Sequence, residues 1–239
     1  MPDPPQLVIC GNGSVDDPDA SLIYDQTMSQ LETYYPDLVK DVSVMRLDPN
    51  DQLINTLLAN AHVVLQLSTR EGFEVKVSEA LHAGRPVIVT NTGGIPLQVK
   101  DKVNGFLVAP GDWKAVATHL MELFTDDDLW KRMSHAASTG VSDEVGTVGN
   151  ALAWYYLASK WHEVGVERHG KGGLKGNERW VNDMAREEAG YPYQPHENRL
   201  PRHFTENKKV PVHPRPVEPE EPKEVTEPQV TPAETEAEA

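Results

Sequence analysis

Short, continuously apolar runs alternate along the chain with longer segments whose apolar residues recur at helical spacing. Five of the apolar runs are rich in β-branched residues and are read as strands, at residues 6–11, 41–47, 62–68, 86–91 and 105–110. Their apolar residues are consecutive rather than alternate, which is typical of strands buried on both faces in a parallel sheet. The pattern therefore predicts an α/β fold.

Helical patterns fill the intervals between these runs. Residues 21–35, 51–60 and 113–125 place apolar residues on one helix face, with Pro36 ending the first helix and Asp112 positioned to cap the third. Strand and helix alternate in this way to about residue 137. This order is typical of a doubly wound domain, which binds ligands at the carboxyl ends of its strands. Two further helices are expected at 143–165 and 178–190, and little regular structure from Tyr191 on.

Composition divides the chain into three parts. Residues 1–165 form the expected α/β domain, residues 166–209 a helical or irregular extension, and residues 210–239 a disordered acidic tail with seven prolines and eight glutamates. The net charge is −15, to which the tail contributes −6. The remaining body is still acidic, so it lacks the basic face that nucleic-acid binding requires.

The sequence also disfavours a reactive cysteine, a metal site, and a membrane or secreted location. Cys10 lies in an apolar run and is expected to be buried as a small hydrophobe. No cluster of His, Cys and carboxylate residues has metal-site spacing. No apolar stretch approaches the roughly 18 to 20 residues that span a bilayer, and the first residues do not resemble a signal peptide, so we expect a cytoplasmic protein with no membrane contact.

The candidate chemistry lies in residues 68–96, "STREGFEVKVSEALHAGRPVIVTNTGGIP". Residues 68–73 form the loop at the carboxyl end of a strand, and a helix follows that is closed by Gly84. Val77, Ala80 and Leu81 give this helix a face that can pack on the sheet. The backbone N–H groups of residues 72–75 then point from a helix N-terminus into the ligand crevice. Such donors suit a phosphate or a sugar oxygen.

Glu71 and Glu79 are eight positions apart in this stretch. A glycosidase pair needs two carboxylates roughly 5 to 10 Å apart, whereas eight helical residues rise about 12 Å. The spacing therefore leaves two interpretations: a clamp that holds two parts of one ligand, or surface charge, with Glu79 paired to Lys76 and Glu71 favouring a helix N-terminus. Gly93 and Gly94 follow the next strand, where they either line the same crevice or form a turn with positive φ.

These residues carry a family resemblance. "EGFEVKVSE", "ALHAGRPVIVTNTGGIP" and "VNGFLVAPGD" resemble the donor-side domain of retaining GT-B glycosyltransferases of family 4. The residues "STREGFEVKVSEALHAG" and "QLVICGNGSVDDPDA" are similar to sequences in the branch of fungal trehalose phosphorylases, also called trehalose synthases. The resemblance covers about residues 5–165. Most relatives have a glycine where this chain has Glu74, and that departure favours the trehalose branch.

The resemblance implies reversible, retaining transfer of glucose between trehalose and phosphate, without a cofactor. Ligands would be glucose 1-phosphate, phosphate or a nucleotide sugar, with trehalose or glucose on the other side. Glu71 would be the catalytic glutamate that holds glucose hydroxyls, and Glu79 would occupy the position that grips the ribose in nucleotide-using relatives. The other implied donor-binding residues are Gly72, Phe73, Val75, Lys76, Gly93 and Gly94.

Two parts of such an enzyme are not found in these residues. One is the second α/β domain, which supplies the acceptor side of the cleft. The other is a first strand and helix carrying an Arg…Lys phosphate-binding pair. In the doubly wound order that strand lies centrally, between residues 6–11 and 62–68, so we expect a gap that exposes a groove or is completed by another chain. We expect a member truncated at its N-terminus that is inactive alone; the alternative is a non-catalytic module that binds a sugar phosphate or another protein.

Overall fold

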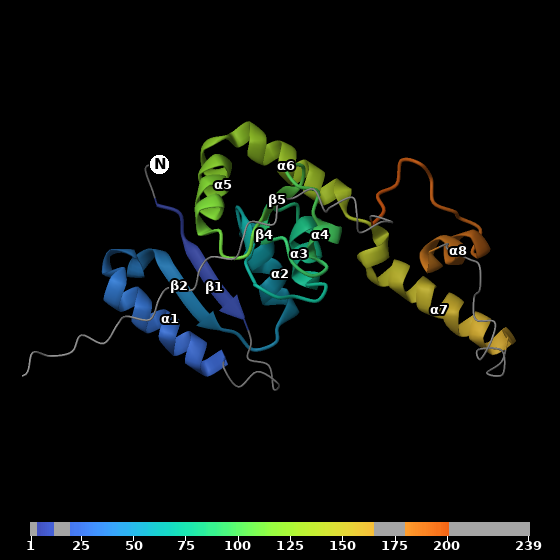
Figure 1. Ribbon diagram of the computed structural model, residues 1–239, viewed down its shortest axis with the longest axis horizontal. Coiled ribbons are helices and arrows are strands. Elements are labelled where there is room, and N and C mark those ends of the chain that lie inside the picture. The colour runs from blue at the N-terminus through green and yellow to red at the C-terminus, as the bar shows by residue number, and fades with distance from the viewer. Residues whose placement is uncertain (1–3, 12–19, 165–179, 201–239) are drawn as a thin grey trace, which may run out of the picture.

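The computed structural model describes residues 4–11, 20–164 and 180–200, which form a mixed α/β arrangement (Figure 1). The strands are β1 (Leu7–Gly11), β2 (Val42–Arg46), β3 (Val64–Gln66), β4 (Val87–Thr90) and β5 (Gly105–Val108). The helices are α1 (Ala20–Tyr34), α2 (Asp51–Asn60), α3 (Val75–His82), α4 (Ile95–Gln98), α5 (Trp113–Thr125), α6 (Asp127–Gly140), α7 (Thr147–Val164) and α8 (Val181–Glu188), with 3₁₀ turns η1 (Pro36–Asp41) and η2 (Asp143–Val145). The acidic tail at 210–239 and the junction at 166–179 lie outside the described residues.

The five expected strands are confirmed, with ends shortened by a few residues, and every ladder is parallel. They do not form one sheet. β1 pairs with β2, and β3, β4 and β5 form a second sheet in that order. The break between the sheets falls between β1 and β3, which is where the sequence predicts a gap.

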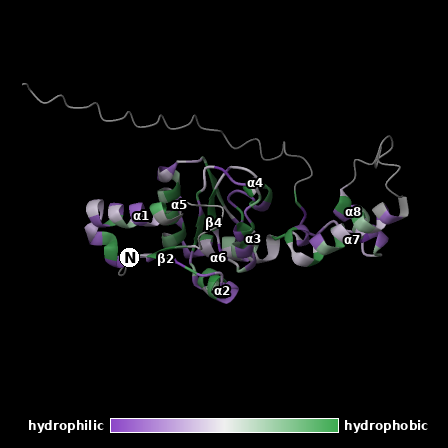
Figure 2. Ribbon diagram, turned by 90° about the horizontal axis from the view of Figure 1, so that it is seen from below, coloured by the Kyte–Doolittle hydropathy of each residue, from purple (hydrophilic) through white to green (hydrophobic). Residues whose placement is uncertain are grey.

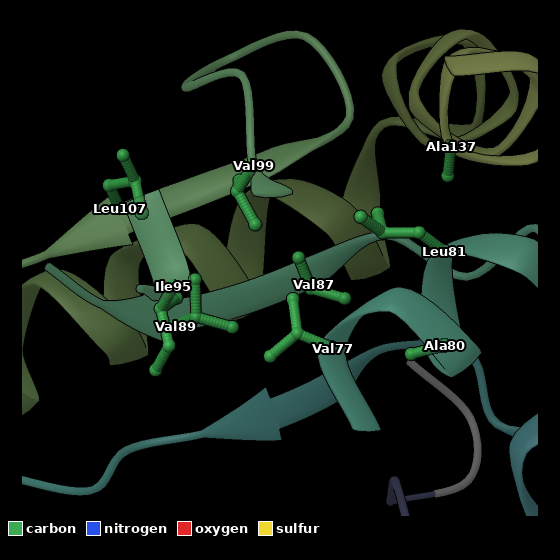
Figure 3. Close-up of a cluster of buried hydrophobic side chains, with 9 residues drawn as sticks. All are labelled: Val77, Ala80, Leu81, Val87, Val89, Ile95, Val99, Leu107 and Ala137. Carbon is green, nitrogen blue, oxygen red and sulfur yellow. The ribbon is translucent and has the colours of Figure 1, made fainter. Parts of the chain in front are cut away.

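The core is built around β4. One face of the second sheet packs against α3 and α6 through nine buried residues, drawn in Figure 3: Val77, Ala80, Leu81, Val87, Val89, Ile95, Val99, Leu107 and Ala137. The other face buries Ile88, Phe106 and Val108 of the strands with Leu123 of α5 and Met133 of α6. Because successive strand residues point to opposite faces, β4 and β5 are buried on both sides, as the continuous apolar runs predict.

Helix ends follow the capping residues in the sequence. The Asn50 side chain accepts a hydrogen bond from Leu53 N at 3.0 Å, and Asp112 accepts one from Ala115 N at 3.0 Å. Asp126 caps α6 in the same way through Leu129 N at 2.8 Å. Each side-chain oxygen satisfies a donor that the first helical turn leaves unpaired. The expected starts of α2 and α5 are therefore confirmed.

β1 differs from the expectation of a buried strand. Leu7, Val8 and Ile9 are 42%, 44% and 42% exposed, and Cys10 is exposed as well. The prediction of a buried Cys10 is wrong. The side chains of a strand point to the two faces of its sheet, and an apolar sequence buries them only where other elements cover those faces.

The C-terminal helices form an arm beside the α/β body. α7 and α8 lie side by side and extend away from the sheets (Figures 1 and 2). The arm has its own polar anchor at Arg186, which is 8% exposed and hydrogen-bonds Glu197 at 2.6 Å and Asp143 at 3.3 Å. Val148 and Tyr155 of α7 are 75% and 77% exposed. None of the helices in the described part of the chain has the length and apolar character needed to cross a membrane.

Candidate functional site

The candidate site is the loop of residues 68–74 at the carboxyl end of β3. Three hydrogen bonds fasten this loop to the end of β4 and the turn after it. Thr90 Oγ1 donates to Ser68 O at 2.6 Å, Thr92 Oγ1 to Thr69 O at 3.3 Å, and Gly94 N to Gly72 O at 2.5 Å. The loop is therefore held in one position by its neighbour across the sheet.

Gly93 allows the closest approach between the two segments. Its φ is +55°, and a Cβ atom placed on it would lie 2.0 Å from Glu71 O and 2.7 Å from Gly72 O. Gly94 has ordinary backbone geometry, but a Cβ there would lie 2.9 Å from Gly72 O. Both interpretations of the glycine pair thus apply together. The turn needs positive φ at Gly93, and its backbone lies directly against the loop that carries Glu71.

The helix after the loop begins later than the sequence indicates. Its N-cap is Glu74, with φ at +59°, and Val77 N donates to Glu74 O at 3.2 Å. The Glu74 carboxylate also accepts from Lys76 N at 3.3 Å. The amides of Gly72 and Phe73 therefore belong to the preceding loop, and one of the free donors of the first turn is already occupied by a carboxylate.

Lys76 lies on the exposed side of this first turn. Its Nζ is 3.8 Å from Glu74 Oε1, and the two side chains are 67% and 12% exposed. Glu74 thus carries both the helix cap and the ion pair. Lys76 is left with most of its charge in solvent, where it can meet an anion.

A polar side chain inside β3 connects the carboxylates. Gln66 Nε2 donates to Ser68 Oγ at 2.8 Å and lies 3.3 Å from both Glu71 Oε1 and Glu74 Oε2. One amide group therefore orients two half-buried carboxylates at the strand end. The second oxygen of Glu71 has no partner among the hydrogen bonds of the described residues, so it can accept one from a ligand hydroxyl.

Gln98 fixes the loop from the other side. Its Nε2 donates to Phe73 O and, at 3.2 Å, to Glu74 O, while its Oε1 accepts from Ser78 Oγ at 2.5 Å. Both side chains are buried. The backbone on either side of the helix start is therefore tied to α4, which preorganises the loop before any ligand arrives.

Glu79 lies apart from this group. It is an exposed residue in the second half of α3, about 6 Å of helical rise beyond Val75. Among the described residues, Lys76 forms its ion pair with Glu74 and none with Glu79. The structure thus brings Glu71, Gly72, Phe73, Gly93 and Gly94 together, sets Val75 and Lys76 at their border, and leaves Glu79 one turn away.

Comparison with known families fits this geometry. The family model of glycosyl transferases group 1 matches residues 3–139, which include the whole loop and both sheets. The chain belongs to this family. Among curated proteins, this glycosyl transferase group 1 chain is 57% identical to the trehalose phosphorylase of Grifola frondosa over 200 residues, or 84% of this chain. It spans about a quarter of that relative's length, 26%.

Solved structures of other glycosyltransferases show the same fold. Sucrose-phosphate synthase from Thermosynechococcus elongatus aligns with a TM-score of 0.58 at 20% identity, over 67% of this chain and 39% of that one. Anabaena Alr3699/HepE in complex with UDP and glucose aligns with a TM-score of 0.55 at 23% identity, over 64% of this chain and 40% of that one. The neighbours are GT-B enzymes, so the α/β body of this glycosyl transferase group 1 chain corresponds to part of a GT-B fold.

Three residues of the site are absent from the sequence-based set. Gln66 has a local signal, since it is a polar residue between the apolar residues Leu65 and Leu67. Glu74 stood out as a departure from the glycine of most relatives. Gln98 had no local signal, because its contacts to Phe73 and Ser78 cross 25 and 20 residues of sequence.

Proposed function

We propose that this chain is the phosphate-side part of a trehalose phosphorylase-type transferase, which moves glucose reversibly between trehalose and phosphate with retention. The 57% identity to a trehalose phosphorylase over 84% of the chain supports this substrate class. The chain spans a quarter of that relative, so turnover needs the acceptor side as well. The 239 residues alone then bind glucose 1-phosphate without catalysing transfer.

The observation that carries the proposal is the preorganised Glu71 loop at the end of β3. The Glu71 carboxylate is oriented by Gln66 at 3.3 Å, and the loop backbone is fixed from the turn after β4, where Gly94 N donates to Gly72 O at 2.5 Å. In the proposed complex the free oxygen of Glu71 accepts a hydrogen bond from a glucose hydroxyl. The amides of Gly72 and Phe73 donate to other sugar oxygens.

The phosphate group then lies at the first turn of α3. The amide of Val75 and the exposed ammonium of Lys76 supply positive potential there. In the forward reaction a phosphate oxygen forms a bond to the anomeric carbon, the bond to the trehalose bridging oxygen breaks, and the released glucose takes up the proton. Glu79 holds a more distant part of the ligand.

The Glu74 carboxylate favours inorganic phosphate or glucose 1-phosphate over a nucleotide sugar. It occupies a donor of the helix N-terminus, 3.3 Å from Lys76 N, and it adds a negative charge beside the anion site. A diphosphate brings more negative charge against it than a single phosphate does. Anabaena Alr3699/HepE, in contrast, is solved in complex with UDP and glucose.

Binding is tested by an NMR titration of the ¹⁵N-labelled chain with glucose 1-phosphate. We expect chemical-shift changes at residues 71–76 at millimolar ligand, and weaker ones with UDP-glucose. Glu71→Gln should weaken the titration about tenfold or more, because a hydrogen bond to a charged group contributes about 1.5 to 3 kcal/mol. Glu32→Gln, an exposed glutamate on α1, is the matched control and should titrate normally. Absence of shifts around Glu71 would refute the site.

Transfer is tested in a chimera, since the chain alone is expected to be inactive. The 239 residues replace the corresponding 200-residue stretch of the Grifola frondosa enzyme, and phosphate-dependent release of glucose from trehalose is measured. We expect turnover that falls about 10- to 100-fold with Glu71→Gln. A chimera that folds and binds glucose 1-phosphate but never turns over would support the non-catalytic binding module instead.

A further inference from the structure

The side-chain amide of Gln98 is fully engaged with the protein. An amide nitrogen carries two hydrogens, and Nε2 of Gln98 donates to Phe73 O and, at 3.2 Å, to Glu74 O. Its Oε1 accepts from Ser78 Oγ at 2.5 Å, and the residue is only 9% exposed. Gln98 therefore has no hydrogen left to donate to a ligand. Its effect on the site must pass through the backbone that it binds.

The two carbonyl groups that Gln98 binds belong to successive peptides. In an extended chain successive carbonyls point to opposite sides, so a single amide group would bind only one of them. Glu74 lies between these two peptides with φ at +59° and ψ at +79°, and this left-handed conformation turns the second carbonyl back toward Gln98. A residue with a side chain adopts that conformation at a penalty equivalent to about 5- to 30-fold in population. The two hydrogen bonds from Gln98 offset this penalty.

The same two peptides present their N–H groups on the opposite side. Both peptides are trans, and in a planar trans peptide the C=O and N–H groups point in opposite directions. Because both carbonyls point to Gln98, the N–H groups of Glu74 and Val75 point away from it. No hydrogen bond within the described part of the chain uses either of these N–H groups. Val75 is 56% exposed, so this first turn is open to solvent.

The other two free donors of the helix start are occupied. A helix leaves its first four N–H groups without an intrahelical partner, here those of residues 74–77. Lys76 N donates to the Glu74 carboxylate at 3.3 Å, and Val77 N donates to Glu74 O at 3.2 Å. The N–H groups of Glu74 and Val75 are consequently the two backbone donors that remain for the phosphate of the proposed function.

We propose that Gln98 is a positioning residue for the phosphate, an inference that rests on the proposed function. Gln98 holds Glu74 in the left-handed conformation and thereby directs the N–H groups of Glu74 and Val75 toward neighbouring phosphate oxygens. It does so without touching the ligand. Its own position is fixed because α4 is anchored in the core by Ile95 and Val99, which are 0% and 2% exposed (Figure 3).

The variant Gln98→Met tests this role, because methionine is a long unbranched side chain without a hydrogen-bond donor. The first measurement needs no ligand: the ¹³Cα and ¹³Cβ chemical shifts of Glu74 in the full 239-residue chain report its backbone conformation. We expect left-handed shifts in the unchanged chain and their loss in Gln98→Met. The second measurement is a titration with inorganic phosphate, followed at the amides of Glu74 and Val75, which should weaken by about fivefold or more.

Two comparisons separate positioning from general destabilisation. Ile88→Val shortens a buried side chain on the other face of the second sheet, so it should lower Tm while the Glu74 shifts and the phosphate titration stay unchanged. In the Glu74→Gly background positive φ carries no penalty, so Gln98→Met should weaken the titration there by only about twofold or less. Circular dichroism shows which variants fold, and Gln98→Leu replaces Gln98→Met if that chain does not.

Two results would overturn the proposal. One is a folded Gln98→Met chain that keeps either the left-handed Glu74 shifts or the phosphate titration of the unchanged chain. The other is an equal loss of titration in Ile88→Val, which would make Gln98 an ordinary core residue. If the unchanged chain shows no phosphate-induced shifts while Gln98→Met still loses the left-handed Glu74 shifts, the phosphate site of the proposed function is refuted and the backbone role of Gln98 is supported.

Discussion

Replacing Gly93 with alanine tests whether the candidate loop is held by close backbone packing. The added Cβ would lie 2.0 Å from Glu71 O, and contacts below 3.0 Å require something to move. Alanine at a φ of +55° also carries the left-handed penalty of about 1 to 2 kcal/mol. With the displaced loop included, we expect a loss of about 2 to 3 kcal/mol in the free energy of unfolding.

The same change should affect ligand binding. The Glu71 carbonyl must retreat by about 1 Å, and displacements of that size cost up to about 100-fold at a positioned group. We expect the glucose 1-phosphate titration to weaken at least tenfold. Thermal unfolding by circular dichroism should show Tm lowered by about 5 to 10 °C, since 1 kcal/mol shifts Tm by about 2 to 4 °C in a chain of this size.

Gly72→Ala is the control for stability within the same loop. A Cβ on Gly72 meets nothing within 4 Å, and its φ is outside the left-handed region. We expect its Tm to stay within about 2 °C of the unchanged chain. If Gly93→Ala melts and titrates like the unchanged chain, the loop is not held by this contact and the argument for a preorganised site is wrong.

Three further changes probe separate parts of the structure. Gln66→Ala removes the donor 3.3 Å from Glu71 Oε1 and should weaken the glucose 1-phosphate titration about fivefold, with a smaller loss of Tm than Gly93→Ala. Glu74→Gly removes a side chain from a residue with φ at +59°, so we expect a Tm about 2 to 4 °C higher. The change also removes a carboxylate beside the anion site, so inorganic phosphate should bind more tightly. Unchanged binding would refute the electrostatic role of Glu74. The hydrogen bond from Arg186 lowers the pKa of Glu197. The bond therefore stabilises the folded arm above the ordinary carboxyl pKa, and this stabilisation is lost as pH falls below about 4. The hydrogen-exchange protection factors of α8, which correct for the intrinsic effect of pH on exchange, should therefore fall in acid, and Arg186→Met should abolish that pH dependence.

The polar anchor of the arm shows why such groups titrate far from their usual range. Burial by itself lowers the pKa of Arg186, but its hydrogen bonds to Glu197 and Tyr193 and the charge of Asp143 outweigh this and raise it. Burial, together with the hydrogen bond that Tyr193 donates to Asp143 at 2.8 Å, raises the pKa of Tyr193. Arg186 thus stays charged and Tyr193 neutral at physiological pH. The segment after α8 remains attached to η2.

Local sequence patterns were sufficient for the five strands, for the helices other than α4 and α6, and for one core face. Val77, Ala80 and Leu81 are at helical spacing, and all three are at most 1% exposed. The prediction for Cys10 failed for a physical reason: the burial of an apolar strand depends on which elements cover the two faces of its sheet, and no local pattern records them. The role of Gln98 is hidden in the same way, since the backbone oxygen it binds lies 25 residues earlier.

The edge of the second sheet and the candidate site share one strand. β3 carries Gln66 at its end and leads directly into the Glu71 loop. The hydrogen bonds described above that fasten this loop come from Gln66 itself, from the segment that begins at the end of β4, and from Gln98 of α4. Nothing from β1 reaches the loop among those contacts. Among those contacts the loop is therefore positioned by the second sheet, the turn after β4 and α4. Under the proposed function, these residues supply the donor side of the site, and transfer needs the acceptor side as well.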